Sequence, residues 1–391
     1  MINGFDIICI SGSDWEHPWG SKQQIMSRLA LKNRILYVEY QANFMHIFRT
    51  FVKKRLIFLF GKLRKVNDNL YIYTPPLCFL PFGYYFRIIN RLNQKILSIL
   101  VHRKIKKIGF KEFMFWIYHP SAVDLIKYFK FSFIIYHCIA DFPHEKNNPL
   151  RRNTMFSMEN ELVRKSDIIA AMTEDLYRRF SKANGKVIYF PSAVDFEYFY
   201  KKSTEKLDMP EDLKKIKKPV LGIVGYLDAK VFDLELLEHL VTSRSQWSLV
   251  LIGPIFRDSL SFKRLRSKNN VYFLGGKKYY EVPSYIKFLD VCLIPYKKNK
   301  FTENVSPLKL YEYLSFGKPV VSTDFLKNEL PLDLIRIAGD REEFIENIEL
   351  SLSELDSSLS RRRIEFARDN SWDKRVEAVS QFIENIKNER N

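Results

Sequence analysis

The sequence is poor in cysteine and has no long apolar run. Its 391 residues include only 4 cysteines, widely spaced and without a CxxC pair or a Cys/His cluster: Cys9, Cys78, Cys138 and Cys292. This pattern suggests neither a disulfide framework nor a structural zinc site, and it predicts a cytosolic protein. No apolar run approaches the ~20 residues of a membrane-spanning helix. The opening MINGFDIICISGS has an acidic residue before its short apolar run, which favours a first strand over a secretory signal.

The sequence is also short of acidic residues. It contains 45 Asp and Glu against 63 Lys and Arg, a formal net charge of +18. Such a charge predicts an anionic partner: a nucleic acid, an anionic membrane surface or a phosphorylated substrate. Residues 44–65 and 86–107 interleave Phe, Leu and Ile with Arg and Lys, as in helices that lie in the headgroup plane. Alternatively, the apolar side is core and the cations are solvated. Both interpretations stay open for 86–107, whereas the Phe-rich 44–65 favours membrane contact.

The first half alternates short apolar runs with helical patterns. Strands and helices in alternation predict a parallel sheet covered on both faces. The predicted strands are Asp6–Ile10, Arg34–Val38, Leu70–Tyr73, Phe113–Tyr118, Phe133–Tyr136, Ile168–Ala171 and Lys186–Phe190.

A charged segment separates this pattern from a second one. The run KKSTEKLDMPEDLKKIKKP after Asp195 is poor in large apolar residues, as expected of a linker. The pattern restarts with Val220–Val224, Ser248–Ile252, Val271–Leu274, Val291–Ile294 and Val320–Ser322 as strands. The length and the 46% hydrophobic content suffice for two domains. We predict domains over 1–200 and 219–370, a linker over 201–218 and a terminal helix over 371–391 that returns to the first domain.

Residues 304–323, NVSPLKLYEYLSFGKPVVST, predict a helix with a defined start and end. Ser306 is a good N-cap, and Pro307 suits the first helical position because its missing N–H would be unpaired there. Gly317 can adopt the left-handed conformation that closes a helix, and Pro319 prevents continuation.

The same helix carries a cation and a carboxylate on one face. Lys309 and Glu312 are three residues apart, so their side chains are neighbours on the helix surface. The first-turn amides form an anion site. An ordinary surface ion pair is the alternative interpretation.

Taken together, these segments resemble the GT-B glycosyltransferases of family four (group 1), in particular a bacterial branch associated with teichuronic acid and exopolysaccharide synthesis. The second half matches in VGYLDAK, LVLIGP, NVYFLGGKKYYEVPSYIKFLDVCLIPY and SPLKLYEYLSFGKPVVST, and the first half in SDWEHPWGSKQQ, WIYHPSA and IIYHCIADF. The resemblance covers essentially the whole chain. It implies an α/β fold of two Rossmann-like domains whose parallel sheets face a central cleft, with a C-terminal helix that crosses back.

The resemblance also implies a retaining, metal-independent transferase without a cofactor. A sugar would move from a nucleoside diphosphate sugar on the second domain to a glycan, polysaccharide or lipid-linked acceptor on the first. The expected location is cytoplasmic, peripheral at the inner face of the cell membrane, with the anionic membrane surface as a partner and no nucleic acid. Front-face displacement is expected, because no nucleophile is identified that would lie within the ~5 Å typical of double displacement.

On the donor side, the resemblance assigns Glu312 to the ribose hydroxyls. A carboxylate suits this task, since it can accept two charge-assisted hydrogen bonds. The helix amides and Lys309 would meet the diphosphate, where negative charge grows in the reaction. The other expected donor contacts are Asn304, Ser306, Pro307, Leu308, Gly225, Lys230, Gly253, Gly275 and Tyr279. Tyr279 would stack on the base or be a packing residue.

Two positions depart from the family pattern. The acidic residue usually found eight positions before Glu312 is Asn304 here, with Glu303 beside it. The arginine usual after the first strand of the second domain is replaced by Tyr226, so that Lys230 or Lys309 would serve the phosphates.

In the first half, His137 matches a family histidine that reaches the donor sugar or its phosphate, and Asp141 lies in the loop after it. With Lys309, these two are the candidate catalytic residues. Gly20, Gln23 and His119 are expected on the acceptor side. Trp15 and Trp19 would stack on a sugar or cover the core.

Two other functions stay open. A sugar-nucleotide epimerase could use the same fold, since fold does not determine reaction. A basic lipid-binding or nucleic-acid-binding relative without turnover would fit the departures at Asn304 and Tyr226.

Overall fold

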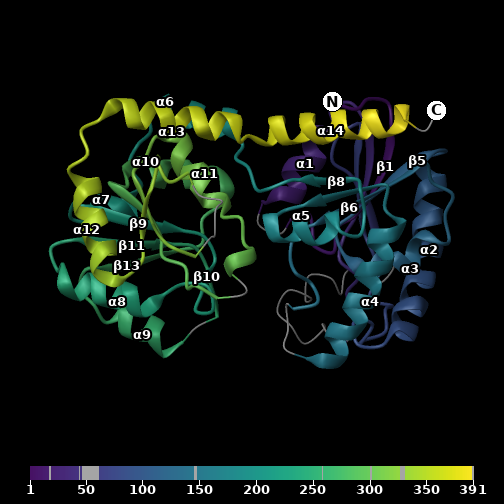
Figure 1. The fold of residues 1–391 in the computed structure, drawn as a ribbon, viewed down its shortest axis with the longest axis horizontal. Coiled ribbons are helices and arrows are strands. Elements are labelled where there is room, and N and C mark those ends of the chain that lie inside the picture. The colour runs from purple at the N-terminus through teal and green to yellow at the C-terminus, as the bar shows by residue number, and fades with distance from the viewer. Residues whose placement is uncertain are drawn as a thin grey trace. The chain divides into compact units, whose positions relative to one another are not determined.

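The computed structural model describes residues 1–16, 19–43, 45, 61–144, 148–257, 259–299, 302–325 and 331–389, without the side chains of Arg257 and Asn304. The chain divides into two compact units: residues 1–191 with 375–391, and residues 192–374. In each unit, helices pack against a mainly parallel sheet (Figure 1). The predicted α/β class is confirmed.

The first unit is built on an 8-stranded sheet in the order β3-β4-β2-β1-β5-β6-β7-β8. All neighbouring strands are parallel except β3 and β4. Every residue of β1, β5, β6 and β7 is buried, as in sheets covered on both faces. All the strands predicted for this half are present. The bounds are β1 Asp6–Ile10, β2 Arg34–Val38, β3 Lys62–Lys65, β4 Leu70–Thr74, β5 Phe113–Ile117, β6 Phe133–Cys138, β7 Ile168–Ala171 and β8 Val187–Tyr189.

Strand β3 lies within residues 44–65, where the sequence predicts a basic amphipathic helix. For residues 62–65 this prediction is wrong, because they pair antiparallel with β4. Leu63 packs on the core of the unit while its charged neighbours remain at the sheet edge. Residues 46–60, which hold most of the proposed membrane stretch, lie outside the described residues.

Helix α2 (Arg87–Ile108) forms from the second basic stretch. Leu97, Val101 and Ile105 are buried in the core of the first unit, so the core interpretation is correct for this face. Gly109 closes the helix in the left-handed conformation (φ 70°). The other helices of this unit are α1 Ser21–Leu29, α3 Val123–Ile126, α4 Pro149–Lys165, α5 Glu174–Ser181 and most of α14, Trp372–Asn388.

The second unit contains a 6-stranded parallel sheet in the order β13-β11-β9-β14-β15-β16 and a two-stranded sheet of β10 and β12. The strands are β9 Val220–Val224, β10 Leu227–Asp228, β11 Ser248–Ile252, β12 Ile255–Arg257, β13 Val271–Gly275, β14 Val291–Ile294, β15 Val320–Thr323 and β16 Arg336–Ala338. The helices are α6 Phe196–Thr204, α7 Glu211–Lys214, α8 Leu234–Ser243, α9 Leu260–Arg266, α10 Val282–Phe288, α11 Leu308–Ser315, α12 Arg341–Leu352 and α13 Ser357–Asp369.

Residues 201–218, expected to be a linker, are part of the second unit, which begins at Ser192. Leu213 and Ile216 are buried in its core. Their apolar side chains are spaced within a charged run, so the composition of the run hides its packing. The second unit extends to Lys374 rather than to residue 370.

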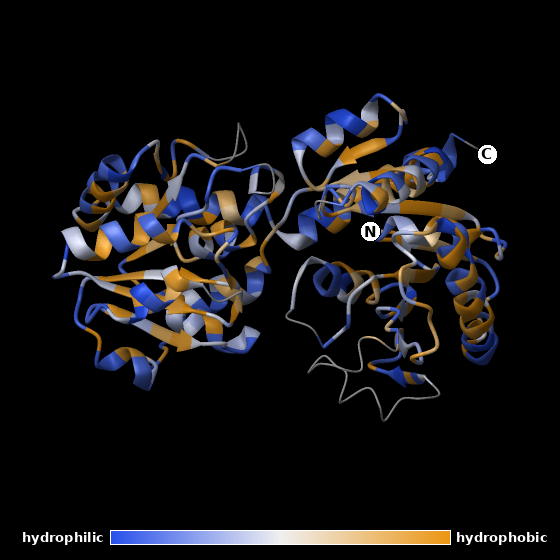
Figure 2. Cartoon of the chain, turned by 90° about the horizontal axis from the view of Figure 1, so that it is seen from below, coloured by the Kyte–Doolittle hydropathy of each residue, from blue (hydrophilic) through white to orange (hydrophobic). Residues whose placement is uncertain are grey.

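Hydrophobic residues concentrate on the strands of both units, and hydrophilic residues on the outer turns of the helices (Figure 2). Within the described ranges, no helix combines the length and the apolar content needed to cross a membrane.

Candidate functional site

Helix α11 ends as the sequence predicts but starts differently. Gly317 is left-handed (φ 67°), and strand β15 begins directly after Pro319. At the start, Pro307 is the N-cap residue, and no described side chain caps the helix. Ser306 does not cap it, because its hydroxyl accepts a hydrogen bond from the Ser192 backbone N–H at 3.1 Å. The predicted Ser306 cap is therefore wrong.

Glu312 is buried in the second unit, with 1% of its surface exposed. Lys309 Nζ donates to its Oε2 at 2.6 Å, and no other side chain in the described ranges donates to this carboxylate. Burial raises the pKa of Glu312, and the charge of Lys309 opposes the rise. The pair is not a surface ion pair, because the carboxylate is removed from water.

Contacts with the ends of other segments hold α11 in place. The Val224 N–H, at the end of β9, donates to the buried Tyr313 Oη at 2.8 Å. Ser192 Oγ donates to the Ser306 carbonyl at 3.1 Å. Helix α11 therefore lies at the carboxyl edge of the sheet, where open parallel sheets bind ligands. The amides of its first turn lack partners within the helix and favour an anion.

The predicted glycines lie at the same edge, each at or just after the end of a neighbouring strand. Gly225 follows β9, Gly253 follows β11 and Gly275 ends β13. All have positive φ. Gly225 N donates to the Ile252 carbonyl at 2.9 Å, and a Cβ at Gly253 would lie 1.7 Å from the Gly225 carbonyl oxygen. The two loops therefore touch through their backbones, which only glycine permits at position 253.

Tyr226, which follows Gly225, and Phe256, in strand β12, form an exposed aromatic pair. Their rings meet edge to face at 6.4 Å, and 41% and 63% of their surfaces are exposed. Sequence reasoning missed Phe256, although its position three residues after Gly253 was a usable signal. Exposed aromatic rings at a ligand-binding edge are suited to stacking on a planar group.

The remaining donor-side candidates are Tyr279, Lys230 and Asn304. Tyr279 stacks on Tyr198 at 5.6 Å and packs beside Phe199, which favours the packing interpretation. Lys230 is exposed, and its backbone N–H donates to Asp228. Asn304 ends a short 3-10 turn, Thr302–Asn304, and its side chain is outside the description.

In the first unit, His119 and His137 are enclosed by aromatic rings. His137 lies within β6, which extends two residues beyond the predicted end, and its ring is 4.8 Å from that of Tyr118. Its Nδ1 is buried and has no hydrogen-bond partner among the residues that the structure describes. His119 Nδ1 accepts from the Ser121 N–H at 3.2 Å. Burial lowers the pKa of each histidine to about 3, so both are neutral at pH 7.

Asp141 belongs to an ion-pair network that does not include His137. Its carboxylate pairs with Arg179 at 3.0 Å and with His144 at 2.8 Å. Arg179 also pairs with the buried Glu159 at 2.6 Å. This arrangement is typical of a structural network that ties the loop to α5.

On the acceptor side, Gly20 and Gln23 order the loop that precedes α1. Gly20 N donates to Gln23 Oε1 at 3.2 Å, and Gln23 Nε2 donates to the Trp15 carbonyl at 3.1 Å. Trp15 is buried, with its ring 4.9 Å from that of Tyr37, while Trp19 is 36% exposed. The core interpretation holds for Trp15. Sequence reasoning missed Lys22, whose side chain also binds this loop.

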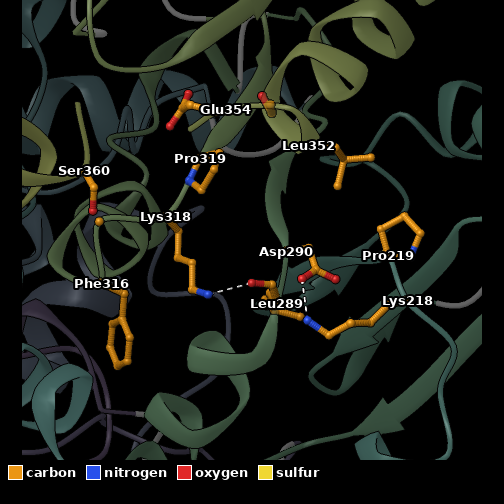
Figure 3. Close-up of a pocket in the computed structure, with 12 residues that line it drawn as sticks. Lys218, Pro219, Leu289, Asp290, Phe316, Lys318, Pro319, Leu352, Glu354 and Ser360 are labelled. Carbon is orange, nitrogen blue, oxygen red and sulfur yellow. Dashed lines mark hydrogen bonds and ion pairs between the residues drawn. The ribbon is translucent and has the colours of Figure 1, made fainter. Parts of the chain in front are cut away.

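A cavity of about 680 Å³ lies in the second unit at the opposite edge of the sheet (Figure 3). Pro219, Asp290 and Pro319, at its wall, each precede a strand. Its lysines are paired: Lys218 with Asp290 at 2.8 Å, and Lys318 with backbone carbonyls at 2.7 Å. Ligands in such sheets bind at the carboxyl ends, so this cavity is separate from the candidate site.

No group of three or more His, Cys, Asp or Glu side chains in the described ranges is arranged as a metal site.

Residues 218–354 match the family model described as "Glycosyl transferases group 1". TuaH of Bacillus subtilis (strain 168), named for a glycosyltransferase role in teichuronic acid biosynthesis, is 26% identical over 273 residues. The match covers 66% of this chain and 68% of TuaH.

Solved structures of similar fold extend over nearly the whole chain. Sucrose-phosphate synthase from Thermosynechococcus elongatus has a TM-score of 0.70 at 15% identity, covering 98% of this chain and 99% of that one. HepE of Anabaena in complex with UDP has a TM-score of 0.63 at 14% identity, covering 98% of this chain and all of the other (100%). The resemblance stated from the sequence is confirmed, and the fold is GT-B.

Proposed function

Since the chain is a glycosyltransferase with the GT-B fold, related to the group 1 family, we propose that it transfers a sugar from a nucleoside diphosphate sugar to a glycan or lipid-linked acceptor. We further propose that the transfer retains the anomeric configuration and uses no metal ion. HepE, of the same fold, is in complex with UDP, and TuaH is named for teichuronic acid biosynthesis; both support this substrate class.

The observation that carries the proposal is the buried carboxylate of Glu312 beside the start of α11. A desolvated carboxylate accepts strong hydrogen bonds from a pair of vicinal hydroxyls, the group that a ribose presents. Because Lys309 occupies only Oε2, Oε1 is available for such an interaction.

The diphosphate would meet the first-turn amides of α11. Fixed N–H donors and the Lys309 ammonium stabilise the negative charge that grows on the leaving group as the glycosidic bond breaks. In this proposal they carry out the task that a divalent ion performs in other transferases. Gly225 and Gly253 support it, because neither residue places a side chain at the end of its strand.

Retention would follow from attack by the acceptor on the face that the diphosphate leaves. Among the two candidate catalytic groups of the first unit, His137 is neutral and buried, which suits hydrogen bonding to a sugar hydroxyl. Asp141 is paired with Arg179 and His144, and its role in the proposal is to hold the loop after β6.

Association with an anionic membrane surface is part of the proposal, and helix α2 supports it. Ile88, Leu92 and Ile99 are 70%, 49% and 51% exposed. Lys95 and Arg103 are exposed among them, and spacings of three and four residues place all five on one helix face. Apolar and cationic side chains on one exposed face favour an anionic headgroup layer.

The test is to incubate the protein with a panel of nucleotide sugars, with and without lipid-linked and polysaccharide acceptors. We expect one donor to stabilise the protein and an acceptor to gain one sugar, detected by mass spectrometry. The anomeric configuration of the product, determined by NMR, tests retention. An epimerised donor without any glycosylated product would favour the epimerase, and absence of binding to every donor would refute the proposal.

A further inference from the structure

A second cavity, of about 350 Å³, lies between the start of α2 and the loops that follow β2 and β4. The two loops run side by side, because Asn43 and Phe79 form an isolated parallel bridge. The volume falls in the range of about 300–1,000 Å³ that is typical of small-molecule sites. Every described residue that lines the cavity belongs to the first unit, so the cavity is complete within that unit.

The walls of this cavity combine aromatic rings with side-chain amides. Phe79, Phe82 and Tyr84 are among the rings, and Asn93 and Gln94, on α2, are among the amides. None of the described residues that line the cavity carries a charge. Rings offer flat apolar surface, and amides offer hydrogen bonds. The walls therefore suit a neutral ligand that is apolar on its faces and rich in hydroxyls at its edges, as a sugar ring is.

Gln94 Oε1 is a buried acceptor that has no hydrogen-bond partner within the described part of the chain. Only 1% of the Gln94 surface is exposed. Its Nε2 donates to Gln41 Oε1 at 3.1 Å and to Asn90 Oδ1 at 3.4 Å, so the amide nitrogen faces oxygen atoms and the carbonyl oxygen faces away from them. Buried polar groups are nearly always paired. The unpaired oxygen beside the cavity therefore indicates a ligand with an O–H or N–H donor.

The loop after β4 is fixed on α2 and contains a strained residue. Asn93 accepts from the Leu80 N–H and donates to the Leu80 carbonyl, both at 2.8 Å. Phe82 has φ 65°, which is unusual for a bulky side chain, and 52% of its surface is exposed. Strain of this kind concentrates at ligand sites, where the surrounding structure maintains it. Phe82 thus supplies the cavity with a ring that the core does not use.

The cavity lies next to the expected acceptor residues but does not contain them. The ring of Tyr84, at its wall, is 4.8 Å from the ring of His119. Gly20, Gln23 and His119 are not among the described residues that line the cavity. A sugar in the cavity is therefore distinct from a sugar held at His119, and Tyr84 lies between the two positions.

We propose that this cavity binds a sugar unit of the acceptor other than the unit that reacts, so that the acceptor is an oligosaccharide. The inference rests on the proposed function, which supplies a glycan acceptor. Gln94 Oε1 accepts from a hydroxyl or an acetamido N–H of the sugar, and the Phe82 ring packs against its face. An alkyl chain would leave Gln94 Oε1 unpaired. The protein then extends a glycan that another glycosyltransferase has begun.

Ligand-observed NMR titration of the full chain with maltotriose and with triacetylchitotriose tests the site. One trisaccharide offers hydroxyls alone, and the other also offers acetamido groups. We expect at least one of them to bind, and Gln94→Leu to weaken its affinity about tenfold, the scale of one hydrogen bond. The exposed Gln381→Leu on α14 is the matched control. Equal affinities of the parent and Gln94→Leu would overturn the inference, as would no binding of either trisaccharide by the parent.

Phe82→Gly separates sugar binding from folding. Glycine adopts a positive φ more readily than phenylalanine does, and the Phe82 ring is exposed, so the temperature of unfolding should not fall. The affinity for the trisaccharide should fall several-fold, because the ring no longer packs against the sugar. Unchanged affinity would contradict the site. Binding of farnesol that is lost in Phe82→Gly, with no binding of either trisaccharide, would assign the cavity to a lipid chain instead.

Acceptor length distinguishes failure of this inference from failure of the proposed function. For the parent, an oligosaccharide acceptor should have a lower KM than a monosaccharide acceptor with the same terminal sugar, and Gln94→Leu should raise only the KM of the oligosaccharide. Transfer to both acceptors with equal KM would refute the site and retain the proposed function. Gln94-dependent binding of a trisaccharide, without transfer from any nucleotide sugar, would keep the site and refute the proposed function.

Discussion

The Lys309 ammonium lies 2.6 Å from the Glu312 carboxylate, three residues along α11. Glu312 is almost completely buried, whereas the Lys309 side chain retains 22% of its exposure. The pair is therefore asymmetric: water can solvate the lysine when the pair opens, but not the carboxylate. A ligand that brings hydroxyl donors to Glu312 can replace Lys309 and release the ammonium toward a phosphate.

Glu312→Gln should abolish high-affinity donor binding while the fold remains intact. The amide keeps the shape of the side chain but loses the charge-assisted hydrogen bonds that we propose with the ribose hydroxyls, at about 1.5–3 kcal/mol. We expect the Kd of the nucleotide sugar, measured by calorimetry, to rise about tenfold to hundredfold. The exposed Glu346→Gln on α12 is the control. Unchanged affinity in Glu312→Gln would remove the residue from the site.

The stability of the protein should depend on pH through Glu312. Burial raises its pKa above the value of 4.5 in the unfolded chain. Between these two pKa values the folded protein binds a proton that the unfolded chain has released. The contribution of Glu312 to the free energy of unfolding therefore decreases as pH rises from 4.5 through the folded pKa. Thermal unfolding of the parent and Glu312→Gln across this range should show the decrease in the parent only.

Around α11 and the loop after β6, the sequence correctly predicted only the features that depend on residues close together in the chain. The end of α11 at Gly317 and the strand after it follow from residues within a few positions. The start of α11 does not follow from nearby residues, because the Ser306 hydroxyl binds Ser192, which is 114 residues away in the chain. Likewise, Asp141 is near His137 in sequence, but its partner Arg179 comes from a helix that the local pattern does not place.

The missed residues have the same physical cause. Lys22 is ordinary in sequence and becomes notable only because the folded loop after β1 accepts two hydrogen bonds from its ammonium. Residues 201–218 look like a linker by composition, yet Leu213 and Ile216 find partners in the core. Burial and pairing over long sequence separations decide these cases, and neither can be read from a short window.

Arg363 should be essential for the stability of the second unit. It is 2% exposed, donates to the Leu334 carbonyl at 2.8 Å and pairs with Glu354 Oε2 at 2.9 Å. Arg363→Met removes the closer cation from the Glu354 carboxylate and leaves only Arg336, 3.9 Å away, which costs about 3 kcal/mol. The neighbouring Arg362→Met loses only an exposed pair with Asp333 and should cost under about 1 kcal/mol. Urea denaturation of both variants gives the comparison; equal losses would contradict the assignment.

Gly253→Ala should lower the stability of the second unit, because it separates the loops that contain Gly225 and Gly253. A Cβ at this position would lie 1.7 Å from the Gly225 carbonyl oxygen, and the φ of 151° is unfavourable for alanine. We expect a loss of about 1–3 kcal/mol in the free energy of unfolding, together with weaker donor binding. Gly276→Ala is the control, since its nearest neighbour would be 3.6 Å away, and it should change stability by under about 0.5 kcal/mol. A tolerated Gly253→Ala with normal donor affinity would show that the loops can separate.

Neutralising the exposed cations of α2 should weaken membrane binding. The triple variant Lys95→Gln, Arg103→Gln, Lys106→Gln removes charges from the face that also exposes Ile88 and Leu92. Each cation near an anionic surface contributes about 1 kcal/mol, so partitioning onto phosphatidylglycerol vesicles should fall about hundredfold. Co-sedimentation with these vesicles measures the change, and added salt should reduce binding of the parent toward that of the variant.

The control for this prediction removes the same charge from the second unit. Lys214→Gln, Lys215→Gln, Lys217→Gln changes three exposed lysines and leaves α2 intact. If net charge alone attracts the protein to the membrane, both triple variants should lose binding equally, because long-range attraction depends on total charge. Greater loss in the α2 variant would locate the contact on that helix, and Leu92→Ser should then weaken binding further, since its apolar side chain would no longer insert into the headgroup layer.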